Sequence, residues 1–135
     1  MQSNSSQELE IITITNDGAG ESFFSERKIT LNGDENRRLS NQISAINFRL
    51  RTSGNEYASD WHVAGDPTLL IMLQGEMQIE LRNGKKKTFA PGEMFIAEDF
   101  LQKELEFDHL KHGHRAQVIS PKGVQVLHLK LEKLC

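Results

Sequence analysis

Short segments in which apolar and polar residues alternate, each closed by turn residues, constrain this chain more than any other feature. In Ile46–Arg51 and again in Met77–Arg82 the alternation is strict, which is the period of a β-strand with one buried face. Asn83-Gly84 follows the second segment, and Thr88-Phe89 resumes the pattern after three lysines, which predicts a β-hairpin. The sequence therefore predicts a protein built from β-strands.

Further short strand-like segments recur along the chain, separated by turn residues. They are Ile11–Thr15, Ile29–Leu31, Met94–Ala97, Ala116–Ile119 and Val124–Leu131. No long helical periodicity competes with them, so we expect an all-β sandwich or barrel. Residues 99–113 do not alternate, and we expect a short helical or irregular insertion there. Its five large apolar side chains should be buried, either as a lid on the barrel or against a partner subunit.

The length of the chain fits one domain. Its 135 residues are enough for a single closed core. Residues 1–8 are polar, and we expect them to form a disordered tail before a single domain at 9–135. The start of the chain has no hydrophobic signal region, and the longest apolar run, Leu69–Leu73, is far too short to span a bilayer. We expect a cytoplasmic protein with no membrane contact.

Charge and cysteine content exclude several functions. The formal net charge of −3 gives no basic footprint for nucleic acid, and Lys85–Lys87 are expected to form a solvated turn. The single cysteine, Cys135, cannot form a disulfide or a cysteine-rich zinc site within one chain.

Two segments carry a resemblance to a known family. They are Asp60–Gly75, DWHVAGDPTLLIMLQG, and Asn83–Asp99, NGKKKTFAPGEMFIAED. The second resembles the turn–strand unit of cupins. The first is similar to a subgroup of small cupins that begin with Trp-His and carry a Glu-Asp pair before a later Gly-His, here Gly113-His114. Over about residues 43–131 the chain thus resembles a small single-domain cupin of the RmlC-like superfamily. The resemblance implies a double-stranded β-helix (jelly-roll) barrel, paired as a homodimer, with a metal or small molecule in its lumen.

The resemblance also implies where a metal would bind. Counting back from Gly75 places the first cupin ligand at His62, the second at Ala64 and the glutamate at Thr68, and the histidine of the second motif matches His114. Two of the four usual metal ligands are therefore missing, at Ala64 and Thr68. This weakens the prediction of a divalent metal such as iron, manganese, nickel or zinc, because such sites commonly use three protein ligands or more.

A third metal ligand would have to come from elsewhere in the chain. Glu98, Asp99 and His112 are the candidates, and with His62 and His114 the acidic Glu98 would complete a set of two histidines and one carboxylate. Since Glu98 and Asp99 are adjacent, they point to opposite faces of a strand, and only one of them can easily face the lumen. His114 is equally a candidate for contact with a bound small molecule.

Other residues are candidates for binding a small molecule. His62 is expected to face the lumen as a ligand contact or as a catalytic acid/base, since a neutral imidazole accepts a proton near pH 7. Trp61 and Tyr57 would form an aromatic wall, and Arg49 would bind a carboxylate or phosphate. His128, in the last strand, is expected on the outer face.

Three functions remain open from the sequence. The favoured one is a barrel that binds a small molecule in its lumen, with metal occupancy doubtful. The second is an enzyme, either metal-dependent, of the oxygenase or isomerase type, through His62, His114 and a carboxylate, or metal-free through His62. The third is an inert dimeric scaffold whose lumen is filled by bulky side chains. The sequence does not decide whether the protein is an enzyme.

Overall fold

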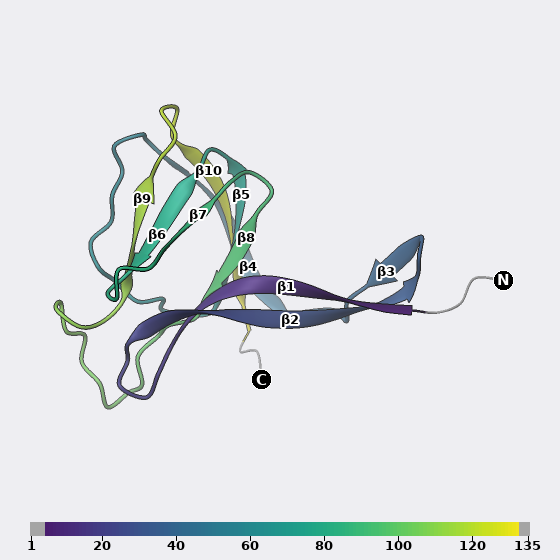
Figure 1. Ribbon diagram of the computed structural model, residues 1–135, viewed down its shortest axis with the longest axis horizontal. Coiled ribbons are helices and arrows are strands. Elements are labelled where there is room, and N and C mark those ends of the chain that lie inside the picture. Colours follow the sequence, from purple (N-terminus) through teal and green to yellow (C-terminus); the bar gives the residue numbers. More distant parts are fainter. Residues whose placement is uncertain (1–4, 133–135) are drawn as a thin grey trace.

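The computed structural model describes residues 5–132, and its regular structure within them consists of ten β-strands (Figure 1). The strands are β1 (Ser5–Asn16), β2 (Ser22–Asp34), β3 (Arg37–Leu39), β4 (Ala45–Ser53), β5 (Thr68–Gln74), β6 (Met77–Leu81), β7 (Lys86–Phe89), β8 (Met94–Ala97), β9 (His114–Val118) and β10 (Val124–Leu131). Across 5–132 there is no helix with the length and apolar character needed to cross a membrane. The prediction of an all-β fold is confirmed.

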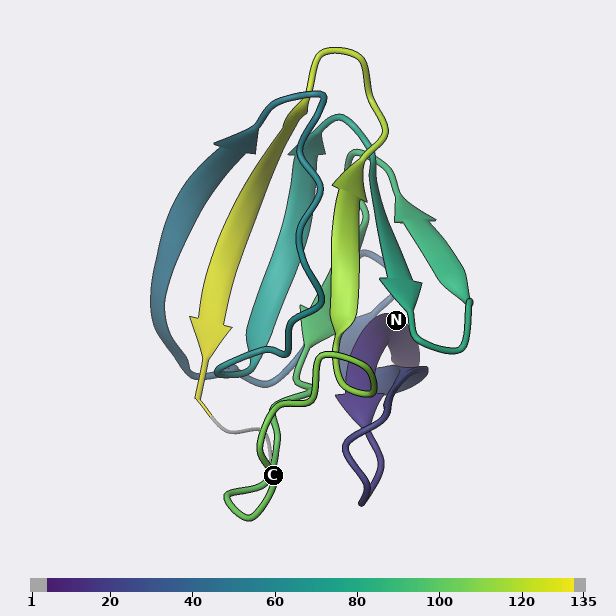
Figure 2. The ribbon, with the colours of Figure 1, turned by 90° about the vertical axis from the view of Figure 1, so that its left-hand side faces the viewer.

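The strands form two sheets that face each other as a jelly-roll barrel (Figure 2). The larger sheet has the order β3-β2-β1-β8-β5-β10-β4, and the smaller has the order β7-β6-β9. Only β1 and β8 pair in parallel, and all other neighbours within 5–132 are antiparallel. The hairpin at Asn83-Gly84 joins β6 to β7, as its sequence predicts.

The hydrophobic core fills part of the space between the two sheets. Met72 and Phe95 from the large sheet are almost fully buried, as are Ile79 and Leu81 from the small sheet. Phe95 also stacks on Phe89 at a centroid distance of 4.3 Å. Alternate residues of each strand thus supply the inner faces, as the alternation in the sequence requires.

β1 and β2 form a long two-stranded ribbon that extends away from the barrel, with β3 near its far end (Figure 1). Their pairing runs from Ser5 opposite Gly33 to Asn16 opposite Ser22. Residues 5–8 are therefore strand, and the prediction of a disordered tail over 1–8 is wrong for them. The backbone groups of β2 provide hydrogen-bond partners regardless of side-chain polarity. Residues 1–4 lie outside the described part of the chain.

β4 is a strand, as predicted, but it has no buried face within one chain. On its outer face Ile46, Phe48 and Leu50 are 56%, 64% and 67% exposed. Alternation identifies an apolar face but does not say what covers it. In this chain nothing from residues 5–132 covers the outer face of β4.

Two irregular segments complete the barrel. Residues 54–67 run from β4 to β5 and close the barrel against β9 through short bridges at Ala58–Gln117 and His62–His114. Residues 99–113 form turns without a helix, which matches the irregular alternative of the prediction. The expected burial of all their large apolar side chains is wrong for Phe100, which is 38% exposed, and for Leu110, which is 85% exposed next to a turn closed on the carbonyl oxygen of Asp108.

Candidate functional site

An open cavity of about 240 Å³ lies inside the barrel, between the two sheets. Its apolar wall includes Leu70, Met77, Ile79 and Phe95, while segment 62–65 lies along it. The polar side chains of its lining are those of Arg51, Tyr57, His62, Thr68, His114 and His128. An apolar cavity with a few converging polar groups is the usual form of a small-molecule site.

His62 and His114 lie side by side because their backbones are hydrogen-bonded to each other in both directions, at 2.9 Å each. Their ring centroids are 4.6 Å apart. Gly113, with φ of +90°, permits this close pairing, since a Cβ there would lie 2.5 Å from the carbonyl oxygen of His62. The segment between β4 and β5 and strand β9 thus place two imidazoles side by side in the cavity lining.

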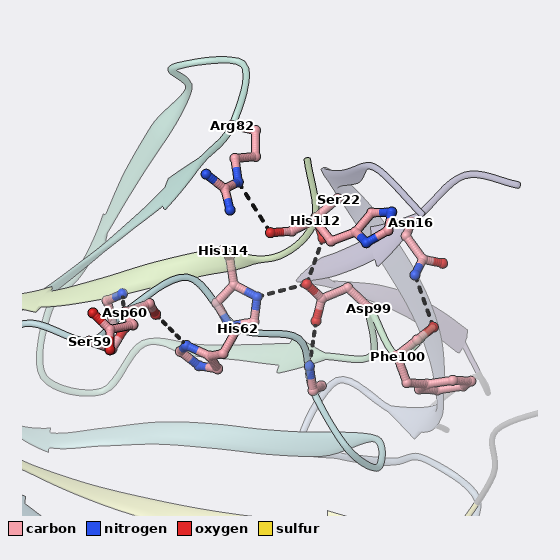
Figure 3. A network of polar contacts seen from close by, with 12 residues as sticks. Asn16, Ser22, Ser59, Asp60, His62, Arg82, Asp99, Phe100, His112 and His114 are labelled. Atoms are coloured by element: carbon pink, nitrogen blue, oxygen red, sulfur yellow. Dashed lines mark hydrogen bonds and ion pairs between the residues drawn. The ribbon is translucent and has the colours of Figure 1, made fainter. Parts of the chain in front are cut away.

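A buried carboxylate holds His114 in place (Figure 3). Asp99 is fully buried, and its Oδ2 lies 2.7 Å from Nδ1 of His114. The Ser22 hydroxyl donates to the same oxygen at 2.6 Å, and the Ala64 N–H donates to Oδ1 at 3.0 Å. Four segments that are distant in sequence therefore meet at this carboxylate, which uses both of its oxygens in doing so.

The protonation of Asp99 follows from these contacts. Burial alone would raise the pKa of Asp99, but the hydrogen bond and charge of His114 and the bonds from Ser22 and Ala64 hold that pKa below its usual value. An ionised Asp99 accepts the Nδ1–H of His114, which fixes the tautomer with a lone pair on Nε2. Within residues 5–132 Nε2 of His114 has no hydrogen-bond partner, and it is not among the buried polar atoms that lack one. It is therefore accessible from the cavity.

His62 and His128 favour their neutral forms in this cavity. Partial burial lowers the pKa of His62, and nearby His114 and Arg51 lower it further, although the carbonyl oxygen of Asp60, 2.8 Å from Nδ1, acts in the opposite direction. Burial also lowers the pKa of His128, as do the charges of Arg51 and Arg49. Among the described residues that line the cavity there is no aspartate or glutamate. Apart from the phenol of Tyr57, its charged and titratable side chains are Arg51 and three histidines.

The structure brings together only some of the residues predicted for the site. Tyr57, His62 and His114 line the cavity as predicted. Arg51 lines it in place of Arg49, two residues along the same strand face. His128 also lines it, so its predicted position on the outer face is wrong.

Trp61 and Glu98 have other partners. Trp61 lies between two guanidinium groups, with Cζ of Arg82 and Arg115 at 3.9 Å and 4.6 Å from its ring centroid. Glu98 accepts two hydrogen bonds of 2.9 Å from Arg27. Neither side chain is part of the cavity lining. Their contacts explain why, because arginine side chains hold both Trp61 and Glu98 outside the cavity. The sequence pattern gave no sign of these arginine partners.

His112 and the rest of segment 99–113 are also committed elsewhere. His112 accepts the N–H of Asp108 at Nδ1 (3.0 Å), and its Nε2 lies 3.2 Å from the carbonyl oxygen of Ala19. Arg82 donates to carbonyl oxygens of this segment, including that of His112 at 3.1 Å (Figure 3). Of the described cavity-lining residues none comes from 100–113, so this structure does not place the segment as a lid over the cavity.

These contacts do not fit a metal held by three protein ligands. His62 and His114 each keep a free Nε2, but Glu98 pairs with Arg27, and both oxygens of Asp99 accept hydrogen bonds. Within 5–132 there is no group of three or more histidine, cysteine or acidic side chains arranged to hold a metal ion.

Comparisons with known proteins return only distant structural similarity. No family model matches the chain, and no curated protein matches it. One similar solved structure is a cupin superfamily protein from Desulfitobacterium hafniense DCB-2, with 16% identity and a TM-score of 0.46 over 70% of this chain and 73% of that one. Another is a protein from Neisseria meningitidis, with 21% identity and a TM-score of 0.44 over 67% of this chain and 84% of that one. Structural similarity this distant says nothing about the ligand or activity of this chain. Its jelly-roll barrel is evident from its own strand order.

Proposed function

We propose that the barrel binds a small anionic molecule in its lumen and holds it with its own side chains. The observation that carries this proposal is the cavity lined by Arg51 and three histidines with no acidic side chain among its described lining residues. Placing a charged guanidinium beside an apolar wall costs solvation free energy, and a bound anion offsets this cost by pairing with the charge. A carboxylate or a phosphate fits its planar set of N–H donors.

Arg51 is available for such a ligand. It forms no ion pair with any residue of 5–132, and the contact recorded for its guanidinium is with the ring of Tyr57, at 4.7 Å from the centroid. Its pairing partner in β10 is Val126, a core residue, so Arg51 lies on the lumen side of the sheet. No acidic side chain of residues 5–132 therefore balances its charge through an ion pair.

The size of the cavity limits the ligand. At about 240 Å³ it is below the range of about 300–1,000 Å³ that is typical of drug-sized ligands. A small metabolite with one apolar side fits Leu70 and Phe95 on the wall better than a sugar nucleotide or a peptide. The same open volume argues against an inert barrel, which would need bulky side chains around His62.

The test is binding of short monocarboxylates, from acetate to hexanoate, measured by isothermal titration calorimetry. We expect binding by the wild-type protein and a loss of about tenfold or more in Arg51→Ala, since a hydrogen bond to a charged group contributes about 1.5–3 kcal/mol. Arg51→Lys should retain part of the affinity because it keeps the charge but not the planar donors. Arg38→Ala, on the remote β3, is the matched control for loss of one positive charge. Equal affinity in wild type and Arg51→Ala would contradict the proposal.

We also propose that a second copy of the chain covers the outer face of the large sheet. The strand register aligns two apolar rows across β5, β10 and β4: Ile71–Leu127–Leu50 and Leu69–Leu129–Phe48. Three strands spaced about 4.8 Å apart, with seven residues each at about 3.3 Å, give a face of roughly 330 Å². This is less than half of the roughly 800 Å² that each partner contributes to a stable interface, so a second copy would also have to contact residues beyond these three strands.

Light scattering after size-exclusion chromatography tests this pairing. We expect a dimer for the wild type and a monomer for Phe48→Asp, because a charge in the centre of an apolar interface is left without a partner. Leu110→Asp is the control, since Leu110 is exposed but lies away from this face. A monomeric wild type, or a Phe48→Asp protein that remains dimeric, would exclude this surface.

A further inference from the structure

The lumen side of β4 carries a second arginine whose charge is also unbalanced within the described chain. Arg49 is opposite His128 in the register of β4 and β10, and Arg51 is opposite Val126. Directly opposed residues share a face of the sheet, and His128 lines the cavity. Arg49 therefore lies on the lumen side, next to the cavity lining rather than within it.

Arg49 and Arg51 have a fixed relation to the cavity. As residues i and i+2 of one strand they are about 6.6 Å apart along the sheet. Both side chains are exposed, but Arg51 lines the cavity whereas Arg49 lies at its rim, outside the lining. His128 lies directly opposite Arg49 in this register, and both arginine charges lower the pKa of His128.

Acidic side chains near this pair are already used. Lys130, the next residue on this face of β10, pairs with Asp66 at 2.9 Å. Asp99 is buried against His114. Neither Arg49 nor Arg51 forms an ion pair with a residue of 5–132. The two cations thus present one unmatched charge inside the cavity and one at its rim.

We propose that the natural ligand is a small dicarboxylate, which rests on the proposed function of binding an anion in the lumen. One carboxylate binds Arg51 beside His62 and His114, and the other binds Arg49 and His128 at the rim. The short apolar part between them contacts the wall at Leu70. A ligand with a single carboxylate leaves Arg49 without its counter-charge, so the distance between the two anionic groups sets the specificity.

Calorimetric titration with two matched series tests this assignment. The dicarboxylates malonate, succinate, glutarate and adipate are compared with the monocarboxylates of the same carbon number. We expect at least one dicarboxylate to bind about tenfold or more tightly than its monocarboxylate counterpart, because a second charged hydrogen-bonding group is engaged. In Arg49→Ala this ratio should fall to about one, and Arg49→Lys should restore part of it.

The controls separate the two proposals. Arg51→Ala should weaken both series, and Arg37→Ala on β3 should change neither, which excludes a simple effect of net charge. Equal affinities of the two series for the wild type, or an unchanged ratio in Arg49→Ala, would overturn the dicarboxylate assignment while leaving anion binding intact. If the folded wild type binds neither series, both proposals fail. Circular dichroism of each variant shows that a loss of affinity is not a loss of folding.

Discussion

Asp99→Ala is expected to lower the free energy of unfolding by about 3–5 kcal/mol, the usual cost of removing one partner from a buried ionic contact. Asp99 is fully buried and is the acceptor for His114, Ser22 and the Ala64 N–H. Alanine leaves all three donors without a partner in a space that water does not readily fill. Urea unfolding at pH 7, followed by tryptophan fluorescence, measures the difference. Native stability is typically only about 5–15 kcal/mol, so this change is large.

Asp66→Asn is the matched control for Asp99→Ala. Asp66 also pairs with a cation, Lys130, but its side chain is 55% exposed, and such pairs contribute about 1 kcal/mol or less. Because the pKa of Asp99 is lowered in the folded state, its contribution is present above its ordinary pKa near 3.8 and is lost as the pH falls through the folded value. Asp99→Asn should therefore flatten the acid side of the stability profile. Similar losses in Asp99→Ala and Asp66→Asn would contradict this role for Asp99.

Much of the fold could be predicted from local patterns. Alternation and turn residues give the strands at 46–51 and 77–82 and the hairpin at Asn83-Gly84, because these features depend on neighbouring residues. The β1–β2 ribbon shows the limit. The start of β1 has polar side chains, and its strand structure comes from pairing with β2, which no local pattern in residues 5–8 records.

Site residues could be predicted only where their spacing from a glycine in a turn identified them. His62 follows from its distance to Gly75, and His114 from its Gly-His context. The role of Asp99 was not predictable, because it depends on Ser22, 77 residues away, and on the path of an insertion of irregular structure. Strand alternation placed Arg49 and Arg51 on one face, but which of them lines the cavity depends on how the barrel closes around β4.

Trp61 shows a different limit. Its position beside His62 suggested an aromatic wall, yet its ring is held outside the cavity by Arg82 and Arg115. Each of these contacts comes from another strand or its end, and stacking of arginine on an aromatic ring leaves no sequence signature. Side-chain partners across sheets are thus the part of the site that needs the three-dimensional arrangement.

Gly113→Ala is expected to lower the free energy of unfolding by about 3–5 kcal/mol through backbone strain and a clash in the site. Gly113 has φ of +90°, and an added Cβ would lie 2.5 Å from the carbonyl oxygen of His62 and 2.7 Å from its carbonyl carbon. These are backbone atoms, so they cannot move aside without breaking the paired hydrogen bonds between His62 and His114. Urea unfolding gives the energy, and carboxylate titration shows whether the two rings still form the site.

Gly84→Ala separates the clash from the strain. Gly84 has nearly the same φ, +86°, but an added Cβ there meets nothing within 4 Å. Its substitution should therefore cost only the strain of a left-handed residue, about 1–2 kcal/mol, and leave carboxylate binding unchanged. If both variants lost the same free energy of unfolding, the clash with the His62 backbone would contribute nothing to the loss. The pairing of the two histidines would then not depend on glycine at position 113. A larger loss at Gly113, together with weakened binding, is expected because the residue that links the Asp99 segment to β9 also sets the distance between the two imidazoles.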